Sequence, residues 1–253
     1  MAQQATSAQT PRLGKAIGPE PSTVGGVVLL LPGGDEVSVR RPSPLAASSV
    51  RALGRRLTRD GRGQGLAAHV VHYRCRGWNG SEAHLARDAS WAADEVVRLY
   101  GDVPVCLAGV DMGGRAALHA GGHPAVESVL AVAPWLPEDD VAAAPEPVKQ
   151  LAGRRVMIVH GTNDERTDPE LSFRLAARVK KTNPGICRFE VHSDGHGLHQ
   201  YWAEVLALAS DFALGTLFGR DFARPVADAL AAPPPLGLRM PLAAGFGAVG
   251  RRR

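Results

Sequence analysis

Residues 106–114 read CLAGVDMGG. The stretch begins with the small apolar residues of a buried strand and runs into a turn marked by Gly109, Gly113 and Gly114. A helix-forming segment follows. Glycines at these positions permit a sharp turn from strand to helix, which projects the central residue above the end of the strand. That residue is Asp111, at a position where most sequences of this outline carry serine.

The segments around this stretch alternate between apolar runs and helical patterns. Continuous apolar runs are typical of strands buried on both faces of a parallel sheet. The sequence predicts such strands at 25–34, 66–75, 103–110, 126–135, 154–161 and 186–192, and helices or helical turns at 43–61, 82–101, 115–124, 147–153, 168–185 and 197–219. Strands separated by helices of this length favour right-handed crossovers. We therefore expect an α/β fold with a doubly wound, mostly parallel sheet and helices on both faces.

The domain organisation follows from length and composition. A chain of 253 residues that is 45% apolar suits one globular domain, expected at 25–220. Residues 1–24 lack the basic start and apolar core of a signal peptide, and we interpret them as a flexible leader. Pro, Ala and Gly interrupt any regular period in residues 221–253, so this part is predicted to be a disordered tail.

Composition also limits the expected partners and compartment. No apolar run reaches the roughly 18 residues of a membrane-spanning helix, so no membrane partner is expected. Part of the net charge of +4 lies in the last three arginines, and basic residues do not interleave with aromatic ones as in nucleic-acid platforms. Cys75, Cys106 and Cys187 lack metal-ligand spacing and are expected to be small core residues in a reducing cytoplasm. No metal or cofactor is indicated, and a small-molecule substrate is the expected partner.

Three polar residues follow predicted strands. Asp111 ends the first of these strands, Asp164 lies in HGTND after another, and His196 lies in SDGHGLH after the last. Because the carboxyl ends of parallel strands meet at one edge of the sheet, we expect these side chains to converge there. Their order along the chain is that of the α/β-hydrolases, not that of chymotrypsin or subtilisin.

From about residue 25 to residue 219 the chain resembles a compact α/β-hydrolase of the dienelactone-hydrolase-like type. It is similar to a bacterial branch with the elbow GHSMGG, the acid loop HGTxD and the histidine loop GHxM or GHxL. The resemblance implies that Asp111 occupies the nucleophile position of a catalytic triad, Asp164 the acid position and His196 the general-base position.

The same resemblance implies an oxyanion hole. The segment LLLPGG corresponds to the loop after the first predicted strand, which implies the backbone N–H groups of Gly34 and Met112 as the oxyanion donors. The elbow itself departs from the family pattern, because Val110 and Asp111 stand where the family has His-Ser. Hydrolysis by an elbow serine is therefore not available to this chain.

An aspartate at the elbow favours a different chemistry. A carboxylate that attacked an ester would form an anhydride, but it is a competent nucleophile towards an alkyl carbon that carries a leaving group, as in an epoxide or a halide. The product would be an alkyl ester of Asp111. Water activated by His196, with Asp164 orienting the imidazole, would then hydrolyse it. Haloalkane dehalogenases and soluble epoxide hydrolases of this superfamily work in this way.

Those enzymes carry a helical cap that stabilises the leaving group. Here only about 41 residues separate Gly114 from Val156, and a helix, a strand and a turn fill most of them, so no cap is expected. Trp78 and Trp135 follow strand ends and are the candidate substrate-pocket residues. Three roles stay open for them: donation to a leaving group, pocket walls, or packing.

Three functions stay open at this point. The first is a hydrolase that acts on a small, apolar molecule through an Asp-His-Asp triad. The second is a catalytically lapsed member of the family that binds a ligand or partner, because two carboxylates beside one imidazole favour a locked ion pair. The third is a lyase or cyclase that uses Asp111 as an acid or base.

Some residues near the motifs have simpler roles. Asp168 is expected to cap the following helix and is the runner-up for the acid. His160 is expected to brace its loop, and His199 to lie at the surface or at a helix start. The remaining histidines, His69, His72, His84, His119, His123 and His192, are expected to be structural.

Overall fold

The computed structural model describes residues 10–138 and 145–248. These residues form one eight-stranded sheet in the order β1-β3-β2-β4-β5-β6-β7-β8. The strands are β1 (Arg12–Leu13), β2 (Gly26–Leu31), β3 (Leu66–His72), β4 (Val105–Val110), β5 (Val126–Val132), β6 (Arg155–Gly161), β7 (Ile186–Val191) and β8 (Met240–Pro241). All neighbours pair in parallel except β1, which pairs antiparallel with β3. The predicted doubly wound, mostly parallel sheet is confirmed.

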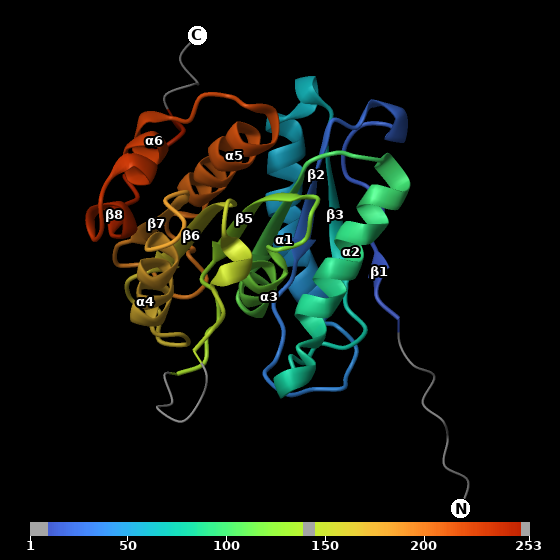
Figure 1. Cartoon of the computed structure of the whole chain (residues 1–253), viewed down its shortest axis with the longest axis horizontal. Coiled ribbons are helices and arrows are strands. Elements are labelled where there is room, and N and C mark those ends of the chain that lie inside the picture. Colours follow the sequence, from blue (N-terminus) through green and yellow to red (C-terminus); the bar gives the residue numbers. More distant parts are fainter. Residues whose placement is uncertain (1–9, 139–144, 249–253) are drawn as a thin grey trace, which may run out of the picture.

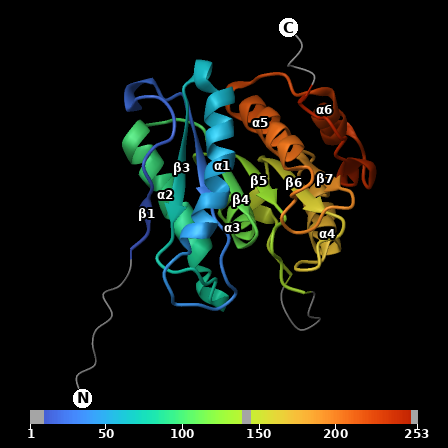
Figure 2. The same cartoon turned by 180° about the vertical axis from the view of Figure 1, so that it is seen from behind.

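Helices cover both faces of this sheet (Figures 1 and 2). The α-helices of the described ranges are α1 (Pro44–Asp60), α2 (His84–Tyr100), α3 (Met112–Ala120), α4 (Pro169–Lys180), α5 (Trp202–Phe218) and α6 (Arg224–Ala231). Helices α2, α3 and α4 pack on one face, and α1, α5 and α6 pack on the other. The predicted helical turn at 147–153 is the short 3₁₀ helix η4 (Lys149–Leu151).

The two faces explain why the central strands are apolar throughout. Val27, Leu29 and Leu31 of β2 pack into the core beneath α2 and α3. Val28 and Leu30, which alternate with them, pack into the core beneath α1 and α5. All five side chains are fully buried, and each contributes about 1.5–3 kcal/mol relative to an exposed position. The continuous run therefore stabilises both layers, and it fixes the strand end from which the site is built.

The part of the predicted leader that the structure describes is ordered against the sheet. Arg12 and Leu13 pair with the end of β3, and the backbone N–H and C=O of Ile17 bond Ala68 at 2.9 and 2.8 Å. The prediction of a flexible leader is wrong for residues 10–24, because the backbone here satisfies its hydrogen bonds along the edge of β3. Residues 1–9 lie outside the described part of the chain.

The predicted disordered tail is wrong for residues 221–248. Helix α6 and strand β8 lie in this segment, and β8 extends the sheet beside β7. Val226 and Leu238 are fully buried, and Nζ of Lys180 donates to the carbonyl of Leu230 at 3.0 Å. The few apolar residues that pack against the core are separated by Pro and Gly. The sequence therefore shows no regular helical or strand periodicity, although the segment is ordered. Residues 249–253 lie outside the described part.

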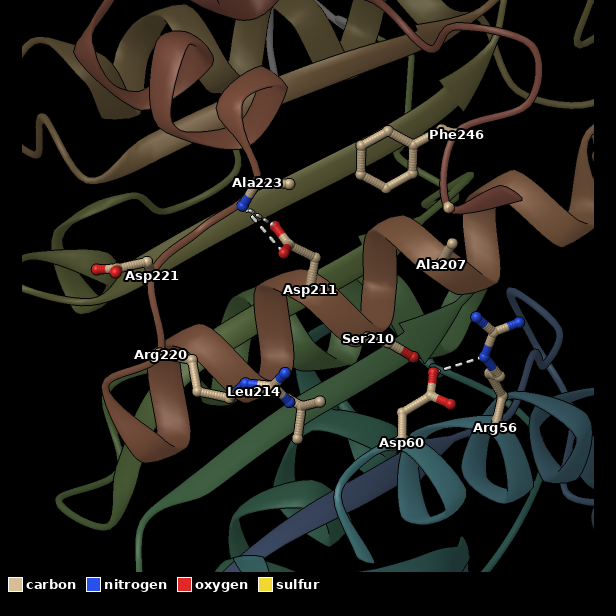
Figure 3. Close-up of a pocket in the computed structure, with 11 residues that line it drawn as sticks. Arg56, Asp60, Ala207, Ser210, Asp211, Leu214, Arg220, Asp221, Ala223 and Phe246 are labelled. Carbon is tan, nitrogen blue, oxygen red and sulfur yellow. Dashed lines mark hydrogen bonds and ion pairs between the residues drawn. The ribbon is translucent and has the colours of Figure 1, made fainter. Parts of the chain in front are cut away.

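The ordered C-terminal segment borders a groove of about 430 Å³ on the outer side of α1 and α5 (Figure 3). Charged side chains of both signs line it, together with Phe246, and the hydroxyl of Ser210 has no hydrogen-bond partner there. The groove does not include the strand ends that carry Asp111, Asp164 and His196.

Two composition-based predictions have structural counterparts. Cys75, Cys106 and Cys187 are buried free thiols, which confirms their role as small core residues. In the described ranges, no helix combines the length and apolar character that a membrane span requires.

Candidate active site

The strand-to-helix turn between β4 and α3 is built around Asp111. Its φ is 56° and its ψ is −126°, a conformation that costs a residue other than glycine roughly 1–3 kcal/mol. A Cβ on Gly109 would lie 2.0 Å from the carbonyl oxygen of Gly113, and a Cβ on Gly113 would lie 2.0 Å from that of Leu31. Only glycine fits at these two positions. The turn is therefore tight, and it lifts Asp111 above the end of β4.

The three residues predicted from the strand ends converge. Nδ1 of His196 lies 2.8 Å from Oδ2 of Asp164, and Nε2 of the same ring lies 3.7 Å from Oδ1 of Asp111. Asp164 follows β6 and His196 follows β7, which is the neighbouring strand. One imidazole therefore lies between two carboxylates at the carboxyl edge of the sheet, as the sequence predicts.

Asp164 is held as a carboxylate by four donors. Its Oδ2 accepts from His160 at 3.1 Å and from His196 at 2.8 Å. Its Oδ1 accepts from the backbone N–H groups of Arg166 and Thr167 at 2.9 and 3.1 Å. Burial raises the pKa of Asp164, but these hydrogen bonds outweigh burial and hold the pKa well below its usual range. Because a carboxylate only accepts, Nδ1 of His196 must donate to it.

His160 is fully buried behind Asp164 and does more than brace the loop. Its Nε2 faces Asp164, and its Nδ1 lies 2.8 Å from the hydroxyl of Ser172. Arg188 donates to the same hydroxyl at 3.0 Å and to the carbonyl of Pro169 at 3.0 Å. The Ser172 hydroxyl also lies 2.9 Å from the carbonyl of Pro169, so both this carbonyl and Nδ1 of His160 are within reach of its proton.

The carboxylate of Asp164 selects one tautomer of His160, because it only accepts and therefore requires the ring proton on Nε2. In the neutral ring this leaves Nδ1 as an acceptor. Burial lowers the pKa of His160, which favours the same neutral form. His160 thus orients the acid without adding a positive charge to the site.

The two carboxylate oxygens of Asp111 have different surroundings. Oδ1 is buried, without a hydrogen-bond partner among the described residues, and faces His196. Oδ2 lies 3.1 Å from Nη2 of Arg166, whose side chain is 56% exposed. Oδ2 therefore has a partly exposed cation as its partner. Burial raises the pKa of Asp111, and Arg166, His196 and the N–H of Met112 oppose that rise without cancelling it.

The loop after β2 closes over the same carboxylate. A Cβ added to Gly33 would lie 2.8 Å from Oδ2 of Asp111, so the loop backbone passes directly beside this oxygen. Met112, the first residue of α3, has its N–H close enough to lower the pKa of Asp111. Gly34 comes one residue later, where a Cβ would lie 2.4 Å from the carbonyl oxygen of Arg76. The oxyanion roles of Gly34 and Met112 stay predictions.

The two tryptophans predicted as pocket residues pack around a cation. The guanidinium carbon of Arg115 lies 4.0 Å from the ring centre of Trp78 and 5.2 Å from that of Trp135. Trp78 is only 4% exposed, and its ring also meets His119 edge-on. The backbone N–H of Trp135 donates to the carbonyl of Asp111 at 3.1 Å. Their role towards a substrate stays a prediction, and their packing holds α3 to the loops on both sides.

Glu146 completes this cluster beneath the elbow. Its carboxylate accepts from Arg115 at 2.6 Å and lies 2.5 Å from Nε2 of His119. Burial raises the pKa of Glu146, but the hydrogen bonds from His119 and Arg115 outweigh burial and lower the pKa to about 2. Arg178 of α4 donates to the backbone carbonyl of Glu146 at 2.8 Å. The cluster fixes the loop after β5 against α3 and α4.

Sequence reasoning missed Arg166 and the full role of His160. Arg166 lies two residues after Asp164, and a cation so close to a predicted acid is the signal that marks it. Asp168 caps α4 by accepting from the N–H of Glu170 at 2.8 Å, as predicted. Among the described residues, no three His, Cys, Asp or Glu side chains are grouped to hold a metal ion.

Comparison with known proteins shows a similarity in fold but no match to a family model or to a curated sequence.

Many solved structures are similar in fold. The esterase Est2 of Thermogutta terrifontis, with butyrate bound, has a TM-score of 0.61 at 18% identity, covering 83% of this chain and 92% of its own. Est1E of Butyrivibrio proteoclasticus, with ferulic acid bound, has a TM-score of 0.59 at 13% identity, covering 81% and 95%. XC6422 of Xanthomonas campestris, described as an α/β serine hydrolase without a lid, has a TM-score of 0.56 at 18% identity, covering 81% and 89%.

These likenesses establish that the chain has an α/β-hydrolase fold. At such low identity they carry no residue roles and no substrate to this chain. Between β5 and β6 the described residues form only η4, so this part of the chain contributes no helical cap.

Proposed function

We propose that this protein is a hydrolase that acts on a small, apolar electrophile through covalent catalysis by Asp111. The observation that carries the proposal is the asymmetry of the Asp111 carboxylate. Oδ2 has the partly exposed guanidinium of Arg166 as its partner, whereas the imidazole of His196, held by Asp164, lies 3.7 Å from Oδ1. A nucleophilic oxygen and a base beside the other oxygen of the same carboxylate are the two groups that a two-step displacement needs.

In the first step Oδ2 attacks an alkyl carbon that carries a leaving group. The new bond joins Oδ2 to that carbon, and the bond from the carbon to the leaving group breaks with its electron pair. The product is an alkyl ester of Asp111. Burial already disfavours the negative charge of this carboxylate, so alkylation removes a charge that the site accommodates poorly.

In the second step water hydrolyses the ester. Nε2 of His196 takes a proton from a water molecule whose oxygen attacks Cγ of Asp111, and Oδ1 carries the developing negative charge. The backbone N–H of Met112, with that of Gly34, would stabilise this oxyanion. The bond from Cγ to Oδ2 then breaks, the departing oxygen takes the proton from His196 so that the alcohol leaves, and the carboxylate re-forms as the remaining water proton is released. The net reaction consumes one water and releases an alcohol, a proton and the leaving anion.

This mechanism is tested by removing the base. The His196→Gln protein is incubated with mixed haloalkanes, epoxides and activated esters, and intact mass and peptide mapping follow. We expect an alkyl group to accumulate on the peptide that carries Asp111, because alkylation does not need the imidazole and hydrolysis does. The matched control is the Asp111→Asn/His196→Gln protein, which should stay unmodified. Turnover by the wild-type protein without any adduct in His196→Gln would contradict the proposal.

A second candidate is a catalytically lapsed protein that binds a ligand in the same place. The observation that favours it is that Arg166 lies 3.1 Å from Oδ2 of Asp111 and His196 lies 3.7 Å from Oδ1, so a basic side chain already faces each oxygen. Such a network can be purely structural. Ligand binding without turnover of any of the three substrate classes would support this candidate.

A further inference from the structure

Arg166 is held by its backbone, while its guanidinium is largely exposed and contacts the Asp111 carboxylate. Its backbone N–H is held by Oδ1 of Asp164 at 2.9 Å. Its guanidinium reaches Oδ2 of Asp111 at 3.1 Å, while its side chain is 56% exposed. The carboxylate of this pair is mostly buried, but the exposed guanidinium stays in contact with water when it moves away from Oδ2. The guanidinium can therefore leave Oδ2 while the loop that carries it stays in place.

In the proposed first step the negative charge moves from Oδ2 of Asp111 to the leaving group, and Arg166 lies next to Oδ2. Before the step the charge lies on Oδ2 of Asp111, and after it the ester is neutral and the leaving group carries the charge. The substrate carbon must displace the guanidinium in order to reach Oδ2. Arg166 thus loses its anionic partner at the moment when a new anion forms on the same side of the site.

We infer that Arg166 is the leaving-group residue of this site, and that the substrates release a stable anion such as a halide or a sulfonate. The inference rests on the proposed function. Arg166, in the loop that carries Asp164, supplies a donor for the leaving anion. The described residues between β5 and β6 form no helical cap that could supply one. Charge-assisted donation from a guanidinium suits an anion that needs no proton.

The tryptophans are less suited to this role. Trp78 is almost fully buried and lies against Arg115. Trp135 also flanks that guanidinium. Both are engaged in the cluster beneath the elbow, whereas Arg166 contacts the attacking oxygen itself.

Epoxides are disfavoured because their opening produces an alkoxide that must be protonated. A guanidinium does not give up a proton in a protein. The hydroxyl of Tyr73 is the nearby acidic group, but it is buried and donates to the carbonyl of Pro32 at 3.2 Å. Burial raises its pKa well above the ordinary value, with Asp88 and Asp111 adding to the rise. Nε2 of His196 lies 3.7 Å from Oδ1, which is the carboxylate oxygen that does not attack the substrate.

The first test measures single-turnover alkylation by primary alkyl iodides, bromides, chlorides and tosylates that share one chain. We expect Arg166→Gln to slow formation of the Asp111 adduct by about 10-fold to 100-fold, and most for the poorest leaving group. Hydrolysis of an adduct that has already formed should keep its rate. Arg224→Gln, which removes an arginine that is 91% exposed on α6, is the matched control and should behave as wild type.

The second test needs no catalysis. Asp111→Asn mimics the neutral ester, so its Arg166 should be free to bind bromide, titrated by calorimetry at constant ionic strength. We expect bromide to bind Asp111→Asn at least about tenfold more tightly than wild type, and binding to disappear in Asp111→Asn/Arg166→Gln.

The outcomes separate this inference from the proposed function. An adduct that forms in Arg166→Gln at the wild-type rate, or with the same dependence on the leaving group, overturns the role of Arg166 and leaves the nucleophile intact. Slower hydrolysis with unchanged alkylation overturns it too. Absence of any adduct in wild type and in His196→Gln overturns the proposed function and this role with it. Equal bromide binding by both asparagine variants removes the anion site.

Discussion

The imidazoles of His160 and His196 share one oxygen of Asp164. Nε2 of His160 lies 3.1 Å from Oδ2 and Nδ1 of His196 lies 2.8 Å from it. One ring is buried and bound to Ser172, and the other is partly exposed and faces Asp111. The buried histidine therefore fixes the acid, and the acid fixes the histidine that is proposed to act on water.

Replacing His160 should destabilise the protein. His160→Leu removes a buried donor to Asp164 and the contact of the ring with the Ser172 hydroxyl, so we expect a loss of about 1–3 kcal/mol in the free energy of unfolding. Urea denaturation of the variant and of His192→Leu, an exposed histidine on the following loop, provides the measurement. Equal midpoints for the two variants would show that His160 does not support the acid.

The loop glycine beside the nucleophile gives a second prediction. A Cβ on Gly33 would lie 2.8 Å from Oδ2 of Asp111, so Gly33→Ala must push the carboxylate out of position. We expect adduct formation to slow by about tenfold or more, because small displacements of a reacting group are costly. Gly63→Ala is the matched control, since a Cβ there meets nothing within 4 Å. Unchanged alkylation by Gly33→Ala would mean that the attacking oxygen lies elsewhere.

The elbow should also support a serine. Asp111→Ser keeps the strained backbone and the main-chain N–H groups of Gly34 and Met112, which do not depend on the side chain. We expect hydrolysis of short activated esters at least about a hundredfold faster than by Asp111→Ala. Measurement of p-nitrophenyl acetate turnover checks this. A folded serine variant no better than the alanine variant would count against a working oxyanion hole.

Acid sensitivity should depend on Glu146. Its pKa in the folded protein is about 2, below the ordinary value of 4.5, so the stability it contributes is present above pH 4.5 and is lost as the pH falls towards 2. At neutral pH we expect Glu146→Gln to lose about 2–4 kcal/mol, because Arg115 is left buried without its partner.

Urea unfolding midpoints of wild type and Glu146→Gln, measured between pH 7 and about pH 2, test this pH dependence. The difference between the two proteins should shrink as the pH approaches 2. A difference that stays constant with pH would show that the Glu146 charge does not stabilise the loop after β5. Glu138→Gln, on the same loop, is the control, because no ion pair of Glu138 is seen in the described structure.

The parallel sheet and the three converging residues were predictable because their signals are local. Strands β2 and β4 are continuous apolar runs, and Asp111, Asp164 and His196 each lie in the loop after a predicted strand. Once the strands are parallel, their carboxyl ends must meet. The tight turn at Asp111 was likewise encoded by adjacent glycines.

The features that were missed depend on contacts between distant segments. Arg166 reaches Asp111 across 55 positions of sequence, and nothing local shows which carboxylate it meets. Strand β8 has only two residues and exists because β7 offers an open edge. Packing was one of the roles left open for Trp78 and Trp135, but the sequence does not show that Arg115 is their partner.

Oxygen transfer from solvent tests the central claim, that Asp111 is a nucleophile, most directly. The wild-type protein, in excess over a primary alkyl bromide, completes a single turnover in heavy-oxygen water, and the peptide carrying Asp111 and the alcohol are analysed by mass spectrometry. The account predicts one heavy oxygen in the Asp111 carboxylate and none in the first alcohol, because water attacks Cγ. Turnover that places the heavy oxygen in the alcohol and leaves Asp111 unlabelled would contradict it.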